Sequence, residues 1–487
     1  MRAAVCCFVL FSMTLSPSAV GRADEPAPIA LRVSPAAEPS PALRYRLMPE
    51  YLDRVEGNAA PMILKAIVVL KNQSPSPKQW EQVVKWLDTP VGELPQEEVR
   101  TFLSSQRAVL EEIRLASLRE ECVWNSAVRE RGAGLFAKLL PELQEARSIG
   151  RLLALEARLA IAQRDYEAAL GSLRVGFAFS RHLAQQEFII SWLVAQSVAG
   201  QMLDQLEALI AAPDSPNVYW ALAALPRPLF DNRGPLEMEG VGVYIMYPEL
   251  RTLATDQRTP KQWQDLWRRI FLQTSALAQE IDLGAPDKQN VPLDLQRVAK
   301  IAAADALLEV RYPVARKELI AAGRAEPDVD AMAKPQVVLL REMQVFDTLR
   351  DDYFKWANLP YWAAADGFQA AEKRLAERSK PELRRQLESF SLADLLLPAV
   401  GRAVEAGVRV DQRVAVLMNV EALRMQAAAD GALPRTLAAV AVVPPPANPF
   451  TGKPGEYRWD EASQTAVLTF SAPRDSDRRQ YSLSLAK

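Results

Sequence analysis

Apolar side chains recur every three or four residues through most of the chain between about residues 50 and 400. This spacing places them on one face of an α-helix. Few segments show the strict alternation of a half-buried strand, so we expect little sheet in this part. Besides a helical pattern within residues 151–184, the periodicity predicts helices at residues 96–121, 187–211, 260–282, 291–309, 335–357 and 361–378.

Two of these regions carry a signal for where a helix starts. Ser215-Pro216 and Thr259-Pro260 each place a hydroxyl side chain directly before a proline. A hydroxyl suits the N-cap, and proline is tolerated at the first helical position because its missing N–H needs no partner there. These pairs predict helices that begin at Pro216 and Pro260. Between them, Gly240-Val241-Gly242 is interpreted as a flexible turn.

The last part of the chain changes character. Residues 398–429 have the pattern of one long helix, which Asp430-Gly431 ends because glycine suits the left-handed cap. Pro444-Pro445-Pro446 then marks a rigid loop. After it come strand patterns at residues 456–459, 465–470 and 481–485. A helix followed by consecutive antiparallel strands is a small α+β unit with a meander.

The first residues have the pattern of a secretory signal. Arg2 precedes an apolar run from Ala3 to Leu15, and Gly21-Arg22-Ala23 places small residues where a signal peptidase would cut. The run is shorter than the roughly 20 apolar residues that cross a membrane. We therefore predict cleavage near Ala23, export to the periplasm or cell envelope, and no membrane span in the soluble mature chain.

These patterns divide the chain into four parts. Residues 1–23 are the predicted signal peptide, and residues 24–49 hold six prolines and are interpreted as an extended linker. Residues 50–397 form a mainly α domain, either an α-solenoid-like stack or an irregular bundle. Residues 398–487 form the long helix with its α+β unit.

Net charge and cysteine content bear on nucleic-acid binding and on disulfide formation. The chain of 487 residues has 58 Lys and Arg against 60 Asp and Glu, so no overall charge draws it to nucleic acid. Of three cysteines, Cys6 and Cys7 lie within the predicted signal, so the mature chain has no intrachain disulfide. Cys122 lies in a helical pattern and is interpreted as a small core residue.

The number of histidines excludes most histidine-dependent active sites and metal sites. His182 is the single histidine, which excludes zinc helices and any site that needs two. It lies in a helical pattern, without a Gly-x-Ser-x-Gly elbow elsewhere, and is interpreted as structural. Thr451-Gly452-Lys453-Pro454 lacks the upstream glycine and the following hydroxyl of a phosphate loop. We predict no metal and no cofactor.

Carboxylates and aromatic residues remain as candidates. The weak catalytic candidates are the acid pairs Glu237 and Glu239, and Asp351 and Asp352, since glycoside hydrolysis needs two carboxyls at a set separation. The favoured interpretation of both pairs is a solvated helix end. The densest aromatic cluster of the chain directly follows Asp352 and consists of Tyr353, Phe354, Trp356, Tyr361 and Trp362. We favour core packing for these rings, and the alternative is the stacking of sugars or peptides. Its candidate binding residues are Trp356, Tyr361 and Trp362.

Residues 151–184 resemble one tetratricopeptide-like helical hairpin. The matching stretch is Ala162-Gln163-Arg164-Asp165-Tyr166-Glu167-Ala168-Ala169-Leu170, followed by Phe177 and Phe179. The usual small residue before the turn and the closing proline are missing, and no second copy occurs at a 34-residue period. The resemblance implies stacked helices.

The C-terminal unit resembles the soluble part of bacterial pilins and type II secretion pseudopilins. Gly431, Leu433 and Pro434 stand where that family has a Gly-x-Tyr-Pro turn, and Asn448-Pro449-Phe450-Thr451-Gly452-Lys453-Pro454 stands where it has an Asp-Pro-Phe-Thr-Gly-Lys-Pro loop. Leucine replaces the tyrosine, asparagine replaces the aspartate, and the apolar half of the pilin helix is absent. The resemblance implies a fold more than assembly into a fibre.

The rest of the chain resembles uncharacterised exported helical proteins of planctomycete bacteria, which imply no activity. The stretches concerned are Leu43–Pro49, Gly57–Pro61, Ser215–Leu222, Phe354–Trp356 and Leu359–Trp362.

Three functions are consistent with these patterns. The leading hypothesis is a non-catalytic envelope protein that binds a segment of a protein partner in a helical groove. The second is an exported hydrolase of wall polysaccharide that uses the carboxylates and the aromatic cluster. The third is a soluble accessory of a secretion or pilus system.

Overall fold

The predicted helices form close to where the apolar periodicity placed them. The computed structural model describes residues 28–124, 134–281, 293–378 and 398–486, so the predicted signal peptide lies outside the described residues. The helices that match their predictions within a few residues are α9 (Ile189–Ala211), α12 (Pro260–Ile281), α15 (Lys334–Phe354), α16 (Tyr361–Arg378) and α19 (Pro398–Asp430).

Two local predictions were wrong about where regular structure breaks. Residues 96–121 form two helices, α4 (Gln96–Ser105) and α5 (Arg107–Ser117), followed by strand β3 (Arg119–Glu121). The predicted flexible turn lies inside α11 (Arg233–Met246). A Cβ added at Gly240 would lie 2.9 Å from the Phe354 ring and 3.0 Å from Arg350, so this glycine lets α15 approach α11.

The predicted helix start at Pro216 is displaced. Helix α10 (Tyr219–Ala223) begins three residues later. The Ser215 hydroxyl does not cap it, because that oxygen accepts a hydrogen bond from Arg424 at 2.9 Å. At the other predicted start, the Thr259 hydroxyl does accept the Gln262 N–H at 3.3 Å, and α12 begins at Pro260 as expected.

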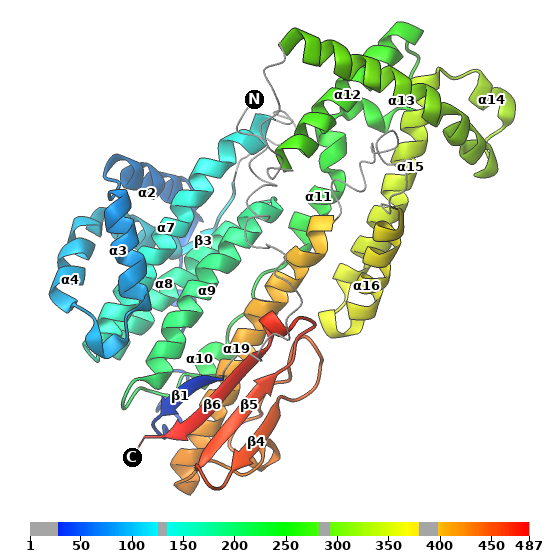
Figure 1. The fold of residues 1–487 in the computed structure, drawn as a ribbon. Coiled ribbons are helices and arrows are strands. Elements are labelled where there is room, and N and C mark those ends of the chain that lie inside the picture. Colours follow the sequence, from blue (N-terminus) through cyan, green and yellow to red (C-terminus); the bar gives the residue numbers. More distant parts are fainter. Residues whose placement is uncertain (1–27, 125–133, 282–292, 379–397, 487) are drawn as a thin grey trace.

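The N-terminal helical group is a layered stack (Figure 1). Helix α8 (Tyr166–Ala184) packs against both α7 (Gly134–Ala162) and α9, and the turn between α7 and α8 has Arg164 in the left-handed region at φ 59°. The predicted helical hairpin is thus present at α7 and α8. The remaining elements of this group are η1 (Tyr51–Asp53), β2 (Val55–Asn58), α2 (Ala60–Asn72), α3 (Pro77–Asp88) and η2 (Val91–Glu93).

A second helical group has a core of its own. Trp263, Trp267 and Phe346 are buried there, and the Trp267 indole N–H donates to the Ala304 carbonyl at 2.8 Å. Helix α13 continues past the predicted end at residue 309 and contains Pro313. Besides α11, α12, α15 and α16, the group contains η3 (Pro248–Arg251), α13 (Leu293–Ala321), α14 (Glu326–Asp330) and η4 (Lys355–Asn358).

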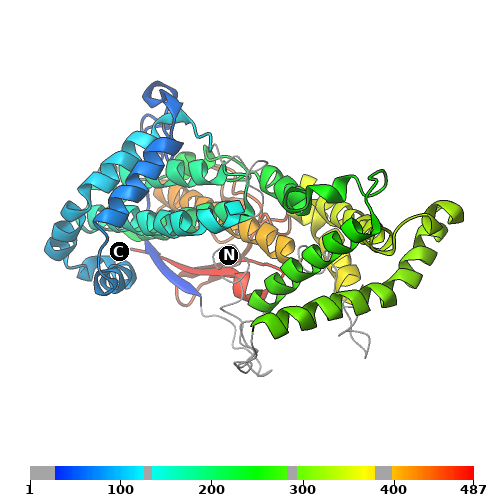
Figure 2. The ribbon, with the colours of Figure 1, turned by 90° about the horizontal axis from the view of Figure 1, so that it is seen from above.

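Helix α19 lies between the two groups (Figure 2). It packs on α9 and α10 on one side and on α16 on the other. Gly431, directly after it, has φ 77°, so the predicted left-handed end is confirmed. No helix in the described part of the chain has both the length and the apolarity needed to cross a membrane.

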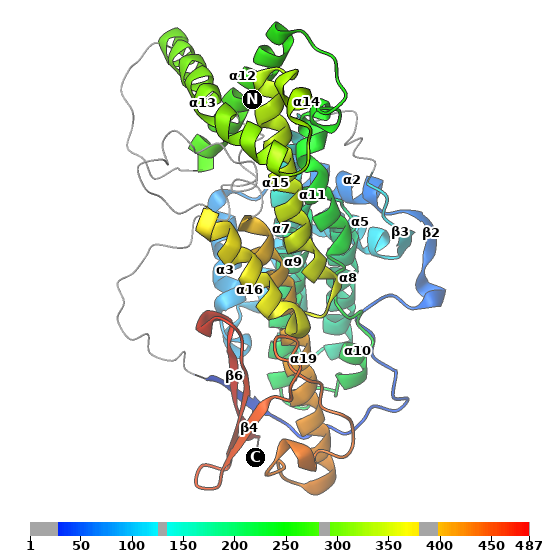
Figure 3. The same cartoon turned by 90° about the vertical axis from the view of Figure 1, so that its right-hand side faces the viewer.

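The C-terminal strands form the predicted meander. Strands β4 (Glu456–Asp460), β5 (Thr465–Phe470) and β6 (Arg479–Leu485) pair antiparallel in that order. The short helix η5 (Leu437–Ala439) lies between α19 and β4, and η6 (Asp475–Asp477) lies between β5 and β6. The sequence did not predict the fourth strand, β1 (Ile29–Val33), which pairs parallel with β6. In Figure 3 this sheet lies far from the small β2–β3 pair.

The segment predicted as a linker is part of the folded body from residue 28 on. Leu31 and Val33 of β1 are buried in the same core as Leu468 and Leu483 of the C-terminal strands, and Leu47 is buried further along. The Glu38 carboxylate accepts the Trp220 indole N–H at 2.6 Å. We refer to residues 34–54 as the arm.

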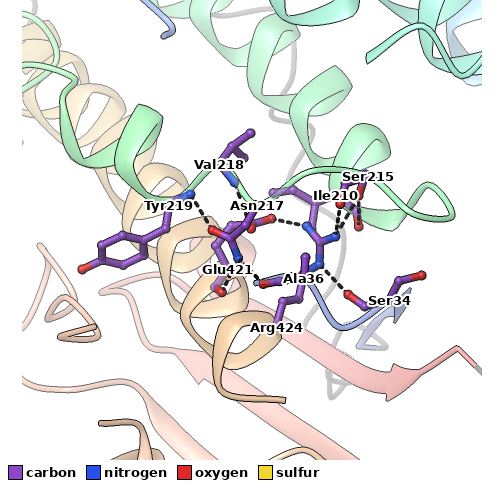
Figure 4. Close-up of polar contacts among 9 residues, drawn as sticks. All are labelled: Ser34, Ala36, Ile210, Ser215, Asn217, Val218, Tyr219, Glu421 and Arg424. Atoms are coloured by element: carbon purple, nitrogen blue, oxygen red, sulfur yellow. Dashed lines mark hydrogen bonds and ion pairs between the residues drawn. The ribbon is translucent and has the colours of Figure 1, made fainter. Parts of the chain in front are cut away.

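A fully buried ion pair holds the arm in place (Figure 4). The Arg424 guanidinium donates to the Glu421 carboxylate at 2.6 Å, and neither side chain is exposed. Its other donors reach the Ser34 carbonyl at 2.9 Å and the Ser215 carbonyl at 2.8 Å. The second Glu421 oxygen accepts the Val218 N–H at 3.1 Å. The pair therefore joins α19, the arm and the loop before α10.

Loss of Arg424 should destabilise the whole protein. Arg424→Met leaves the Glu421 carboxylate buried without its cation, a change that costs about 3–5 kcal/mol. Arg435→Met is the matched control, because Arg435 pairs with Glu461 at the exposed surface and should cost less than about 1 kcal/mol. Urea unfolding followed by circular dichroism measures both, and equal losses would contradict this role.

Candidate functional site

The predicted aromatic cluster is a packed seam between α15, α16 and α19. Tyr353 and Tyr361 are buried, and both rings contact Phe368, at centroid distances of 5.4 and 6.1 Å. Their hydroxyls donate to carboxylates that the sequence did not single out, Tyr353 to Glu372 at 3.1 Å and Tyr361 to Glu405 at 3.3 Å. Burial raises the pKa of both tyrosines, so they remain protonated donors.

The candidate binding residues Trp356, Tyr361 and Trp362 lie near one another but face different neighbours. The half-buried Trp356 ring lies against Gly367, where an added Cβ would be 2.2 Å away. Tyr361 meets Phe450 edge-on at 5.3 Å, and Trp362 covers Gly452. Trp362 keeps 54% of its surface exposed. The seam thus fastens the loop at Asn448–Pro454 to α16.

Asp351 and Asp352 are engaged in surface ion pairs at the end of α15. Asp351 accepts from Arg350 at 2.8 Å, and Asp352 accepts from Lys355 and Arg374. The bond from Lys355 is the main cause of a lowered pKa at Asp352. A carboxyl held ionised by two cations is not suited to donate a proton.

Glu237 and Glu239 lie on α11 and differ in environment. Glu237 is exposed, whereas Glu239 is half-buried, and burial raises the pKa of its carboxyl to about 7. That value suits general acid–base work. However, Glu239 does not line any of the three cavities described below.

His182 and Cys122 are both buried, as expected. The helical pattern predicted around Cys122 was wrong, however, because this residue directly follows strand β3. Burial, aided by Arg181, lowers the pKa of His182 to about 4, so the ring is neutral at pH 7. Burial raises the pKa of the Cys122 thiol to about 12, which keeps it protonated and unreactive. Within the described part of the chain, no group of three or more His, Cys, Asp or Glu side chains could hold a metal ion.

Cavities lie elsewhere, between the arm and the helices beside it: the widest is lined by residues of α5, α7 and α8, and the next by Ala221 of α10. Three adjoining cavities share Pro49 as a lining residue, with volumes of about 580, 360 and 50 Å³. We call them together the arm groove. The largest is within the range of ligand pockets. Its lining residues are Pro49, Asp53, Arg114, Ser117, Leu118, Glu156, Ala160, Ala168, Gly171, Ser172, Arg174 and Val175.

The wall formed by α7 and α8 carries both small and polar side chains. Ala160, Ala168 and Gly171 leave room because they have a methyl group or no side chain. Ser172 donates to the Glu156 carboxylate at 2.8 Å, and Arg114 of α5 pairs with the same carboxylate. Because the arginine neutralises Glu156, this group can orient a bound polar atom but is a poor base for activating the serine.

Exposed apolar side chains border the arm groove. On η1 of the arm, Leu52 is 93% exposed and Tyr51 is 78% exposed. Leu115 of α5, next to the lining residue Arg114, is 52% exposed. Exposed aromatic and aliphatic side chains beside a cavity are typical of surfaces that bind another protein.

Sequence reasoning missed the arm groove although it predicted the hairpin that forms one wall. The small residues Ala168 and Gly171 were a usable signal, because a helix that packs closely on both sides is expected to carry bulkier groups there. The opposite wall comes from the arm, whose prolines indicated only an extended chain. Comparison with known proteins does not identify a function for the groove, because no protein-family model, curated protein or solved structure matches this chain.

Replacing Glu239 should change how stability depends on pH. A carboxyl whose pKa rises from 4.5 to about 7 on folding stabilises the fold below about pH 4.5, and this contribution is lost as pH rises through 7. The free energy of unfolding of Glu239→Gln should therefore exceed that of wild type by up to about 3 kcal/mol at pH 8, whereas the two should be nearly equal at pH 4.

The exposed Glu237 on the same helix provides the control for this measurement. Glu237→Gln should leave the urea midpoint unchanged at both pH values. If Glu239→Gln gave no gain at pH 8, the carboxyl would not be held in a buried environment.

Proposed function

We propose that this protein is a non-catalytic interaction protein of the cell envelope that binds an extended segment of a partner protein in the arm groove. The observation that carries the proposal is the groove itself, a cavity of about 580 Å³ with a built wall of helices and an apolar border. The expected export rests on the signal-like N-terminus alone.

The shape of the groove supports a chain-like ligand. The three cavities follow the arm from Arg46 to Arg54, and each of them contains residues of the arm and of at least one helix. A peptide lying along the arm could place one apolar side chain in the widest part, beside Ala168 and Gly171. Tyr51, which lines the second cavity, would then contact a neighbouring residue of the same peptide, as aromatic anchors commonly do at interfaces.

The other two functions have weaker support. The hydrolase hypothesis required acid pairs beside a cleft, and Asp351 and Asp352 instead pair with cations at the surface. The accessory hypothesis depends on the pilin-like resemblance. The order of a long helix, a loop and a meander is consistent with it, but β1 adds a fourth strand from the distant N-terminal region.

Filling the groove should abolish partner binding. A Cβ added at Gly171 meets no other atom within 4 Å, so Gly171→Trp can place its ring in the cavity without displacing the backbone. Gly242→Trp is the matched control, because Gly242 is also helical, also open, and does not line the groove. Neither change should lower stability, since glycine is a poor helix former.

The measurement is quantitative affinity capture from envelope and soluble fractions of the producing cells. Partners of the groove should be captured by wild type and by Gly242→Trp, and reduced at least tenfold with Gly171→Trp. Equal capture by all three proteins would contradict the groove as a binding site. Partners found only in the soluble fraction would contradict the envelope location.

A further inference from the structure

Most charges of the arm groove are already paired. Arg114 pairs with Glu156, Arg46 lies 3.3 Å from Glu50, and Arg174 lies 3.7 Å from Asp53. These pairs leave the wide part of the groove close to neutral. Its remaining lining there is mostly small and apolar, so this part favours an uncharged side chain.

The narrow part of the groove has an excess of positive charge. Its lining contains Arg54, Arg119 and Arg181, opposed by one carboxylate, Glu120. Among the described residues, none of these three arginines forms an ion pair. Arg119 donates to the Glu56 carbonyl at 2.7 Å, and Arg54 lies 3.4 Å from the Pro49 carbonyl, so both heads are held at the groove.

The neighbouring histidine adds no charge to this part. His182 lines the same cavity, but with its pKa lowered to about 4 the ring is neutral at pH 7. The positive field therefore comes from guanidinium groups, which stay charged at any physiological pH. Guanidinium groups suit carboxylates because their planar donors match two oxygens at once.

We propose that the occupant of the arm groove is an acidic peptide segment in which carboxylate side chains adjoin an apolar residue. This inference rests on the proposed function and specifies the partner. The carboxylates would meet Arg54, Arg119 and Arg181, while the apolar residue enters the wide part beside Gly171. The two parts share Pro49 and Ser117, so neighbouring residues of one peptide reach both.

A nucleic acid fits the groove less well than a peptide does. Its phosphates repeat along the chain, so most of them would lie in the rest of the groove, where Glu50, Asp53 and Glu156 already pair with arginines and no excess positive charge remains. Nucleic-acid affinity depends on cations that meet successive phosphates, and the groove offers them only in its narrow part. A peptide can restrict its negative charge to the few positions that face the arginines.

The test selects ligands from a random pool, so the natural partner need not be identified first. Random dodecapeptides displayed on phage are selected against the full chain, with counter-selection against Gly171→Trp to retain peptides that need the groove. Selected peptides should contain an excess of Asp and Glu beside an apolar residue. Their fluorescein-labelled forms, and a labelled dodecathymidine, are then titrated by fluorescence anisotropy.

Arginine variants identify the charged contacts. Arg54→Gln with Arg181→Gln should weaken peptide binding about tenfold, as expected for the loss of two partly exposed charge pairs, and adding Arg119→Gln should weaken it further. A control with Arg251→Gln, Arg324→Gln and Arg458→Gln removes the same three charges elsewhere and should leave affinity unchanged. Circular dichroism and melting curves check that each variant folds.

The outcomes separate this inference from the proposed function. Groove-dependent peptides that are neutral or basic, or that bind the arginine variants as well as wild type, would overturn the acidic ligand and leave the groove function standing. Tighter groove-dependent binding of dodecathymidine would also overturn it. If no selected peptide depends on Gly171, both the proposed function and this inference fail.

Discussion

The buried guanidinium of Arg424 is the constraint on which the rest of the structure depends. A cation without water is stable only when nearly all its donors are satisfied. Arg424 meets this requirement through Glu421 on its own helix, Ser34 on the arm and Ser215 before α10. These partners come from three distant parts of the chain. If any of the three moved away, the buried Arg424 charge would lose a hydrogen-bond acceptor in an apolar interior.

The same constraint shapes the candidate binding site. The arm leaves the ion pair at Ser34, is held again where Glu38 accepts from Trp220, and reaches Pro49, which lines all three cavities. One wall of the groove is therefore a segment whose only regular structure is the short η1, and its position depends on contacts with α19 and α10. The opposite wall is the rigid α7–α8 hairpin. This combination, an extended chain fixed over a helical surface, gives a groove open enough for a peptide.

The tyrosines and carboxylates of the aromatic seam are residue types found in active sites, but here they stabilise the packing of α15, α16 and α19. Tyr353 and Tyr361 each donate to a carboxylate, Glu372 and Glu405 respectively. Burial, together with the nearby charge of Glu372, raises the pKa of Glu405. Gly401 of α19 is necessary there, since an added Cβ would lie 1.9 Å from the Tyr353 hydroxyl. Such close contact leaves no space for a substrate between these groups.

By itself the sequence determined α9, α12, α15, α16 and α19, the Gly431 cap, the three C-terminal strands, and the buried character of His182. Each of these depends on periodicity or turn chemistry within a few residues of the chain. The tertiary structure alone decided the pairing of β1 with β6, the use of the Ser215 hydroxyl by Arg424 and the existence of the arm groove. Ser34 and Ser215 are separated from Arg424 by 390 and 209 positions. No local pattern records such a contact, because it forms only when the core brings these segments together.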